Sequence, residues 1–405
     1  MTTGEDISAV GSGASGAHSQ EAPVFPFKRT CPFEPAAGYA EGDGIRRVTF
    51  KNVPAWLVTE HRDVKSVLAD RRSSVQNIPD PSRGDSGSEA LPGFFVAMDP
   101  PEQTRLRKML SREFTPRRME AMRPIVERIA NKLIDEMLAQ SGPADLVDAI
   151  ALPLPSLVIC ELLGVPYDKH DWFQVETRKV LDSDATPEEV GGAIAAVMQY
   201  LGELTASKME NPGDDLISLL LNHVRGGDLT VTEVAGMATL LLMAGHETTG
   251  NMISLGVFAL LEHPDQLEQL RQDPSLLPGA VEELLRYLDI IGNLPRTLTA
   301  DMEIGGQTLA EGDLVMVATD AANRDEAVFN EANALDIRRD ARGHIAFGYG
   351  IHTCLGAPLA RVELQVVIGL LLERVPNLKV AVPAEEIEVK SDAKIFGLKS
   401  LPLTW

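Results

Sequence analysis

The stretch Phe347-Gly-Tyr-Gly-Ile-His-Thr-Cys-Leu-Gly356 places one of only three cysteines among three glycines and a histidine. It lies directly before residues 355–375, whose apolar side chains recur at helical spacing. Unpaired N–H groups at the start of a helix favour the thiolate, which is the form of cysteine that binds metals. The stretch therefore predicts a metal-binding Cys354 in a glycine-rich loop.

Two other interpretations of this stretch stay open from the residues alone. Free cysteine is among the most buried residue types, so Cys354 could be structural, with Gly348, Gly350 and Gly356 serving as turns. Alternatively, Cys354 could be the nucleophile of a cysteine hydrolase, with His352 as its base. Spacing alone does not exclude either alternative.

Composition narrows the class of protein. The chain has 405 residues and a formal net charge of −22, which argues against a nucleic-acid partner. Three widely separated cysteines give neither a disulfide framework nor a four-cysteine metal site. Residues 1–20 are rich in small residues, without a basic start or an apolar core. We expect a cytoplasmic protein with a flexible tail at 1–24 and one domain at 25–405.

Periodicity predicts a mainly α protein with small β-sheets. Helical spacing covers 117–140, 148–163, 186–209, 230–262, 276–287 and 355–375. Strand-forming residues predict one hairpin from 46–50 and 55–59, and another over 302–309 that turns at Gly305-Gly306. Residues 77–95 are rich in proline, glycine and serine, which indicates a long loop of the kind that forms lids.

The helix predicted over 230–262 is the longest. Thr230-Val-Thr-Glu233 has the form of a capping box at its start. Polar residues interrupt its middle at His246-Glu-Thr-Thr-Gly-Asn251, so a membrane span is not expected. Helical geometry aligns Leu240, Ala244 and Thr248 on one face with Gly245 beside them, a flat surface for a planar ligand. A solvated polar face or a kink at Gly250 is the alternative.

Glutamate and arginine stand three residues apart at four places, where they can pair on a helix. A solvated surface pair is the default interpretation for each. The pairs are Glu102/Arg105, Glu120/Arg123, Glu268/Arg271 and Glu283/Arg286.

Three of these segments, in this order, resemble motifs of the cytochrome P450 family of haem-thiolate monooxygenases. They are Ala244-Gly-x-Glu-Thr-Thr249, Glu283-x-x-Arg286 and Phe347-x-x-Gly350-x-x-x-Cys354-x-Gly356. The resemblance extends to 98–107, 158–166, 212–216 and 322–325, and it is closest to soluble actinomycete members without a membrane anchor. It implies a single-domain triangular prism with a long central helix over haem b, and a role in secondary metabolism.

The resemblance also implies roles for individual residues. Cys354 would be the axial ligand of the haem iron, shielded by Phe347, and Gly348, Gly350 and Gly356 would let backbone approach the ring. Ala244 and Gly245 would lie against the haem. Arg339 would join Glu283 and Arg286 in a buried structural network.

The propionates of haem need cationic or hydrogen-bonding partners. By resemblance these would be Arg107, Arg296 and His352, since a guanidinium binds a carboxylate in a bidentate way. Gln103 stands where many bacterial relatives have histidine, so it could still donate but without charge.

Thr248 and Glu247 would deliver protons during oxygen activation, which implies an enzyme using O2 and a reductant. A non-catalytic haem sensor on the same fold is the rival hypothesis, and it would have little use for this pair. Electrons would come from a ferredoxin and its reductase. The basic residues fit to steer an acidic ferredoxin are Arg105, Lys108, Arg112, Arg117 and Arg118, although a solvated helix face explains them equally well.

By the same correspondence the substrate would contact the 77–95 loop and three further segments. These positions are mostly apolar, with one polar side chain, so we expect a hydrophobic natural product such as a polyketide, macrolide or terpenoid, hydroxylated or epoxidised. Ordinary core packing is the alternative for each position. The predicted contacts are Phe94, Leu240, Ile291, Asn293, Leu294, Ile395 and Phe396.

Overall fold

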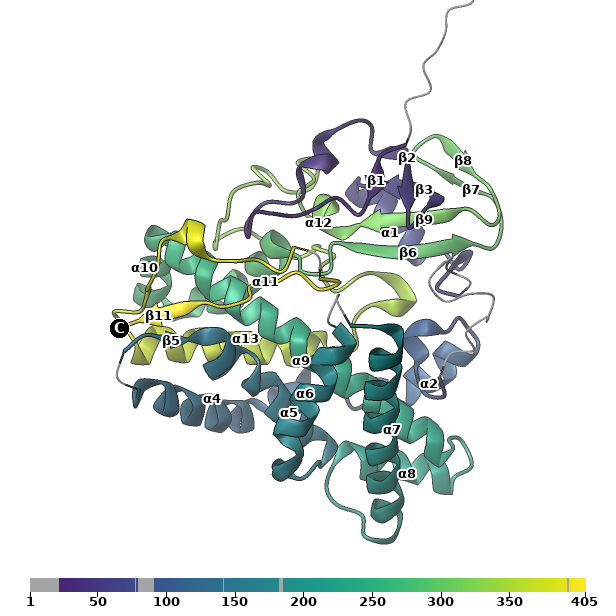
Figure 1. Cartoon of the computed structure of the whole chain (residues 1–405). Helices are drawn as coiled ribbons and strands as arrows, with labels where there is room; N and C mark the ends of the chain where they lie inside the picture. The colour runs from purple at the N-terminus through teal and green to yellow at the C-terminus, as the bar shows by residue number, and fades with distance from the viewer. Residues whose placement is uncertain (1–21, 77, 79–90, 141, 182–184, 392) are drawn as a thin grey trace, which may run out of the picture.

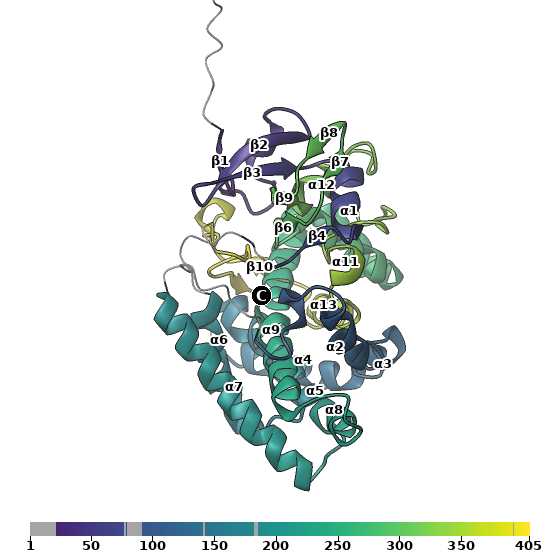
Figure 2. The same ribbon diagram turned by 90° about the vertical axis from the view of Figure 1, so that its right-hand side faces the viewer.

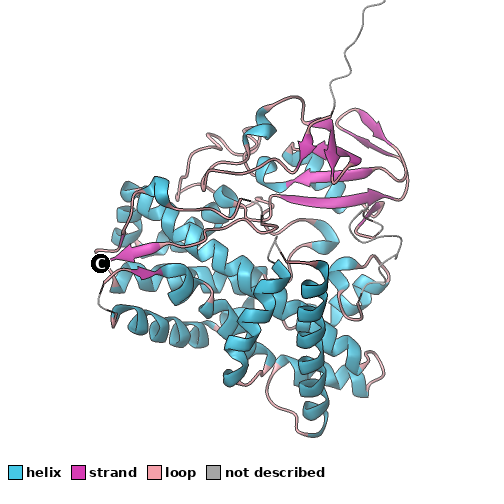
Figure 3. Cartoon of the chain, viewed as in Figure 1, coloured by secondary structure: helices cyan, strands magenta, loops and turns pink. Residues whose placement is uncertain are grey.

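The computed structural model describes residues 22–76, 78, 91–140, 142–181, 185–391 and 393–405. Helices fill most of the molecule; the largest sheet lies at one corner, and the small sheet that contains β5 (Ala144–Asp145) and β11 (Pro402–Thr404) lies apart from it, near the C-terminus (Figure 1, Figure 3). The described α-helices are α1 (His61–Ala69), α2 (Glu102–Ser111), α3 (Pro116–Glu120), α4 (Arg123–Leu138), α5 (Pro153–Leu163), α6 (His170–Leu181), α7 (Pro187–Glu210), α8 (Leu216–Arg225), α9 (Val231–Glu262), α10 (Pro264–Gln272), α11 (Leu277–Leu288), α12 (Thr319–Ala322) and α13 (Ala357–Arg374).

The strands form three small sheets. A six-stranded sheet has the order β1-β2-β3-β9-β6-β4, a three-stranded sheet has the order β10-β11-β5, and β7 pairs with β8. Their bounds are β1 (Val24–Phe25), β2 (Ile45–Phe50), β3 (Val53–Val58), β4 (Ser73–Ser74), β5 (Ala144–Asp145), β6 (Asn293–Leu298), β7 (Met302–Ile304), β8 (Gln307–Leu309), β9 (Leu314–Ala318), β10 (Lys379–Val380) and β11 (Pro402–Thr404).

Helix α9 is the centre of the helical part. Its 32 residues span about 48 Å at 1.5 Å per residue. The predicted capping box is present, because Thr230 Oγ1 accepts from the Glu233 N–H at 3.1 Å and Glu233 Oε2 accepts from the Thr230 N–H at 2.7 Å. The helix contacts α5, α7, α8, α11 and α13, while α6 and α7 form the outer side of the molecule (Figure 2). A mainly α fold with small sheets is thus confirmed.

Two predicted helices are each divided. The 117–140 helix is wrong as one element, since α3 ends at Glu120 and α4 restarts at Arg123 with Pro124 in its first turn, where the missing N–H costs nothing. The 148–163 helix begins instead with a π-turn, Val147–Ala151, and α5 starts at Pro153 for the same reason. The predicted helices at 186–209, 230–262, 276–287 and 355–375 match α7, α9, α11 and α13 within one or two residues.

Both predicted hairpins are confirmed as β2–β3 and β7–β8. Ordered sheet begins at Val24, which pairs with Thr49, so β1 starts one residue inside the predicted tail. Residue 77 and residues 79–90 of the predicted loop lie outside the described residues. After this segment, the Pro92 carbonyl lies so close to Gly236 of α9 that a Cβ at position 236 would be 1.8 Å from the oxygen.

Candidate active site

A large internal cavity of about 1260 Å³ lies between α9, the segment 346–360 and the start of β6. It is lined mainly by apolar side chains. Many of the predicted site residues line it: Arg107, Leu240, Ala244, Gly245, Thr248, Ile291, Leu294, Arg296, Phe347, Gly348, His352, Cys354 and Gly356. The structure thus brings together residues from four separate parts of the chain, and the predicted flat face of α9 forms one wall.

The cysteine loop, residues 347–356, is held by its own backbone. The Cys354 N–H donates to the Phe347 carbonyl at 2.8 Å, and the Thr353 N–H donates to the Gly350 carbonyl at 3.1 Å. The loop ends where α13 begins at Ala357. Protein surrounds the sulfur except towards the cavity, where the free thiol is exposed. This presents the sulfur to a ligand inside the cavity.

The N–H groups at the start of α13 favour the thiolate of Cys354, as the sequence predicts, but they are not the largest influence on its pKa. Burial raises the pKa of the thiol, and this outweighs the opposing effects of the Gly356 and Ala357 N–H groups and of Arg107. The helix start alone therefore does not produce a thiolate. A metal cation deprotonates a coordinating thiol outright, so the donor groups suit a metal-bound sulfur.

Three basic side chains gather at one side of the cavity without a carboxylate in contact among the described residues. Burial lowers the pKa of Arg296 to about 10, although Asp99 opposes this, and burial also lowers the pKa of Arg107. The pKa of His352 falls to about 4 through burial and then through the two arginines, and its buried Nε2 has no hydrogen-bond partner. Buried cations and an unpartnered ring nitrogen fit an anionic ligand. The two propionates of haem meet this requirement.

Two residues that were predicted to contact the cofactor, Gln103 and Gly350, make other contacts instead. Gln103 does not line the cavity; its buried amide donates to the Ile351 carbonyl at 2.8 Å and so supports the cysteine loop from α2. Gly350 also lies outside the lining. It has φ +74°, and a Cβ there would be 2.3 Å from the Leu68 carbonyl at the end of α1. Glycine is needed at 350 for that helix contact rather than for approach to a ring.

The predicted proton-delivery pair is split between two sides of α9. Thr248 lines the cavity, and its hydroxyl donates to the Ala244 carbonyl at 2.7 Å. Glu247 is buried outside the lining, where Lys390 Nζ donates to its Oε1 at 3.2 Å and to Asn251 Oδ1 at 3.3 Å. In this arrangement the acid is bound to the C-terminal segment, and only the hydroxyl reaches the cavity.

Several predicted substrate positions lie outside the cavity lining: Phe94, Asn293, Ile395 and Phe396. Phe95 and Val96 take the place of Phe94, a shift of one residue in a short 3-10 helix. The ring of Phe396 is buried beneath the guanidinium of Arg29, 3.9 Å from its centroid. The lining residues that the sequence did not suggest include Met252 and Glu363, which belong to no motif, and Thr249, which ends the Ala244–Thr249 motif but was given no role.

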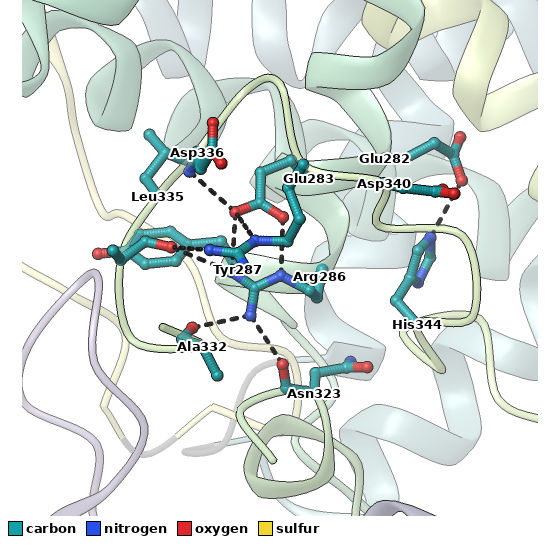
Figure 4. A network of polar contacts seen from close by, with 12 residues as sticks. Glu282, Glu283, Arg286, Tyr287, Asn323, Ala332, Leu335, Asp336, Asp340 and His344 are labelled. Atoms are coloured by element: carbon teal, nitrogen blue, oxygen red, sulfur yellow. Dashed lines mark hydrogen bonds and ion pairs between the residues drawn. The ribbon is translucent and has the colours of Figure 1, made fainter. Parts of the chain in front are cut away.

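The predicted ion-pair network is confirmed behind the site (Figure 4). Glu283 Oε2 lies 2.7 Å from Arg286 Nε, and both side chains are fully buried. Arg339 Nε lies 3.1 Å from the other oxygen of Glu283. Arg286 also donates to the carbonyls of Asn323 and Ala332, both at 2.8 Å. None of these residues lines the cavity, so the network is structural.

A thiol that faces the cavity, basic side chains at one side and a hydroxyl on the central helix fit the haem site that the sequence resemblance implies. The family model described as Cytochrome P450 matches residues 40–179 and 193–405, and the chain belongs to the cytochrome P450 family. It is a monooxygenase whose cofactor is haem b. No helix in the described part of the chain is both long and apolar enough to cross a membrane.

Relatives match the chain over nearly its full length. Cytochrome P450-SU2 of Streptomyces griseolus is 48% identical over 93% of this chain and 94% of the relative. Pentalenic acid synthase of Streptomyces avermitilis is 45% identical over 96% and 98%. The crystal structure of CYP105P1 in complex with filipin I superposes with a TM-score of 0.90 at 40% identity, covering 95% of this chain and 99% of that one. The chain therefore resembles actinomycete members of the family.

Proposed function

We propose that the substrate of this monooxygenase is a hydrophobic natural product such as a polyketide, macrolide or terpenoid, which is hydroxylated or epoxidised. This proposal rests on one observation: the thiol of Cys354 is exposed in a large, mostly apolar cavity, which Thr248 also lines. Similar proteins include a 20-oxo-5-O-mycaminosyltylactone 23-monooxygenase and a mycinamicin VIII C21 methyl hydroxylase. A large cavity with mostly apolar walls suits a large hydrophobic ligand.

Cys354 would hold the haem iron, and Arg107, Arg296 and His352 would hold its propionates. Haem bound in this way would activate O2, which supplies the oxygen atom that is transferred, with electrons from the reductant and the second oxygen atom leaving as water. An anion beside His352 would raise the pKa of its imidazole from about 4 and complete the open hydrogen-bonding capacity of Nε2. Ala244 would present a small side chain to the ring, which leaves room for a flat ligand against α9.

Protons would reach the cavity through Thr248. Its hydroxyl donates its one hydrogen to the Ala244 carbonyl and can accept a hydrogen bond at the same time, so it must turn away from that carbonyl to pass a proton on. Glu247 would supply the proton after its carboxylate leaves Lys390, because the acid itself does not line the cavity. The chain thus needs a side-chain movement at Glu247 before the pair can act together.

Spectroscopy tests the assignment of Cys354. The purified haem-loaded protein, reduced under carbon monoxide, should show the strongly red-shifted band of thiolate haem, and Cys354→Ser should abolish it. Macrolide or terpenoid ligands should displace water from the iron and change its spin state. A wild-type spectrum without the red-shifted band would contradict the ligand assignment, and a spin state unmoved by any hydrophobic natural product would contradict the substrate class.

We propose a ferredoxin as the electron donor, with its acidic face against the basic residues near α2 and α3. Arg105 pairs with Glu102 and Glu233, and Arg118 pairs with Glu113, so these two charges are largely neutralised. The exposed residues left without an ion pair among the described residues are Lys108, Arg112 and Arg117.

Charge reversal tests this surface. Arg112→Glu should slow reduction by an acidic ferredoxin several-fold at low salt, and the difference from wild type should shrink as ionic strength rises. Arg118→Glu is the matched control, because the charge of Arg118 is already paired with Glu113. This variant should slow reduction less than Arg112→Glu does. Equal effects of the two variants would contradict the assignment of this surface.

A further inference from the structure

The side chain of Arg361 lies beside the cysteine loop without touching the sulfur. Arg361 is in the early part of α13, and its guanidinium carbon lies 4.7 Å from the centroid of the Phe347 ring. The carbonyl of that same Phe347 accepts the N–H of Cys354 at 2.8 Å. The guanidinium therefore covers the residue that anchors the backbone of Cys354.

A neighbouring carboxylate fixes this guanidinium. Arg361 Nε and Nη2 donate to Glu282 Oε1 and Oε2 at 2.6 Å and 2.8 Å, which is bidentate geometry. Burial acts to raise the pKa of Glu282, but hydrogen bonds from Arg361 and His344 outweigh it and hold the pKa near 2. The carboxylate is 19% exposed, so it is shielded more than an ordinary surface ion pair.

His344 closes the cluster from the other side. Its Nδ1 accepts from the backbone N–H of Ala346 at 3.2 Å, so the proton of the neutral ring resides on Nε2. That nitrogen lies 3.1 Å from Glu282 Oε2 and donates to it. Figure 4 shows His344 and Glu282 pointing toward one another, apart from the Arg286 network. His344 is also within three residues of Phe347, so both ends of the cluster meet the start of the cysteine loop.

We propose that Glu282, His344 and Arg361 form a clamp that positions Phe347 and thereby holds the cysteine loop in the geometry that keeps Cys354 bound to iron. The three are positioning residues, since none contacts the sulfur. The clamp rests on the proposed role of Cys354 as the axial ligand. It couples α11, the segment before the loop and α13, three elements that must stay in register for the loop to keep its shape.

Loss of thiolate ligation over time measures the clamp. The haem-loaded, reduced protein under carbon monoxide should lose its red-shifted band about tenfold faster in Arg361→Gln, the equivalent of about 1.4 kcal/mol. Glu282→Gln should have a similar effect, because it releases the same guanidinium. The double variant should decay no faster than either single one, since both changes break one interaction.

Matched controls separate the clamp from general destabilisation. Arg374→Gln removes another ion-paired arginine, the partner of Asp135, from the far end of α13 and should leave the decay rate unchanged. Arg361→Lys keeps the positive charge but cannot form the bidentate pair with Glu282. Its decay rate should therefore lie between those of wild type and Arg361→Gln.

Two outcomes would overturn the clamp: Arg361→Gln decaying like Arg374→Gln, or additive effects of Arg361→Gln and Glu282→Gln. A wild-type protein that lacks the red-shifted band would instead contradict the role of Cys354. Failure of the clamp and failure of the proposed function are therefore distinguishable.

Discussion

The contribution of an ion pair to the free energy of unfolding of this protein should depend on its burial rather than on the spacing of its residues in the sequence. Glu283/Arg286 and Glu268/Arg271 share the same separation on a helix. The first pair is fully buried with a 2.7 Å contact, while Glu268 is 54% exposed and 3.9 Å from its arginine. We expect Glu283→Gln to lower the free energy of unfolding by about 3–5 kcal/mol, because it leaves Arg286 buried and uncompensated. Glu268→Gln should cost less than about 0.5 kcal/mol.

The contacts of Glu283 explain the size of the difference. Its two oxygens accept from Arg286, from Arg339 and from the Asp336 N–H at 3.0 Å. Glutamine keeps one acceptor oxygen and turns an NH2 group toward guanidinium donors. Arg286 still reaches backbone carbonyls, which satisfy its hydrogens but not its charge.

Urea denaturation of the haem-loaded protein, followed by far-UV circular dichroism at matched ionic strength, measures both variants. If Glu283→Gln does not fold, Arg339→Gln removes the 3.1 Å contact between Glu283 and an arginine that is 11% exposed, together with hydrogen bonds from that arginine to the carbonyls of Asn330, Glu331 and Ala334, and should cost about 1–2 kcal/mol. Losses for Glu283→Gln and Arg339→Gln no larger than that of Glu268→Gln would refute the reasoning.

Three further predictions concern two residues that line the cavity and one ion pair outside its lining. Thr248→Ala should raise hydrogen peroxide released per product formed, measured with a reconstituted redox partner, and unchanged coupling would remove the proton-delivery role. Lys390→Met should cost about 1–3 kcal/mol of unfolding free energy by leaving Glu247 buried and unpaired, whereas Lys399→Met, from an exposed pair, should cost almost nothing in the same denaturation assay. Burial raises the pKa of Glu363 from 4.5 to about 8, so its stabilising neutral form is complete below pH 4.5 and lost as pH rises through about 8. Between pH 5 and 9 the free energy of unfolding should therefore fall further in wild type than in Glu363→Gln, by up to about 4 kcal/mol. Parallel pH profiles of the two proteins would contradict this.

The elements that could be predicted from the sequence are those with a strong local signal. The capping box placed the start of α9 within one residue, and glycine pairs placed the β7–β8 turn. The sequence alone did not predict the short helices α1, α2, α6, α8 and α10. Each spans only two or three turns, which is too short for a clear periodic pattern, and each is stabilised by packing against the rest of the protein. Proline inside 117–140 and 148–163 was a break signal that the apolar periodicity obscured.

The site residues also fall into two groups, those that local sequence predicts and those that it does not. Residues within the cysteine loop and on one face of α9 follow from local geometry, so Cys354, His352, Ala244 and Thr248 all line the cavity. Positions fixed by distant partners do not follow. The ring of Phe396 is covered by Arg29 from the other end of the chain, and Glu247 is bound by Lys390. Neither contact leaves a trace in the spacing of nearby residues.

Two consecutive glutamates show how one helix can serve both the fold and the site. Neighbouring residues on an α-helix point about 100° apart, so Glu283 faces the buried Arg286 network while Glu282 faces Arg361 and His344. Because both carboxylates project from the same turn of α11, any shift of that turn alters the network and the clamp together. The rigidity of the Glu283 network therefore sets how firmly Glu282 can hold Arg361 against Phe347, and through it the loop that carries Cys354.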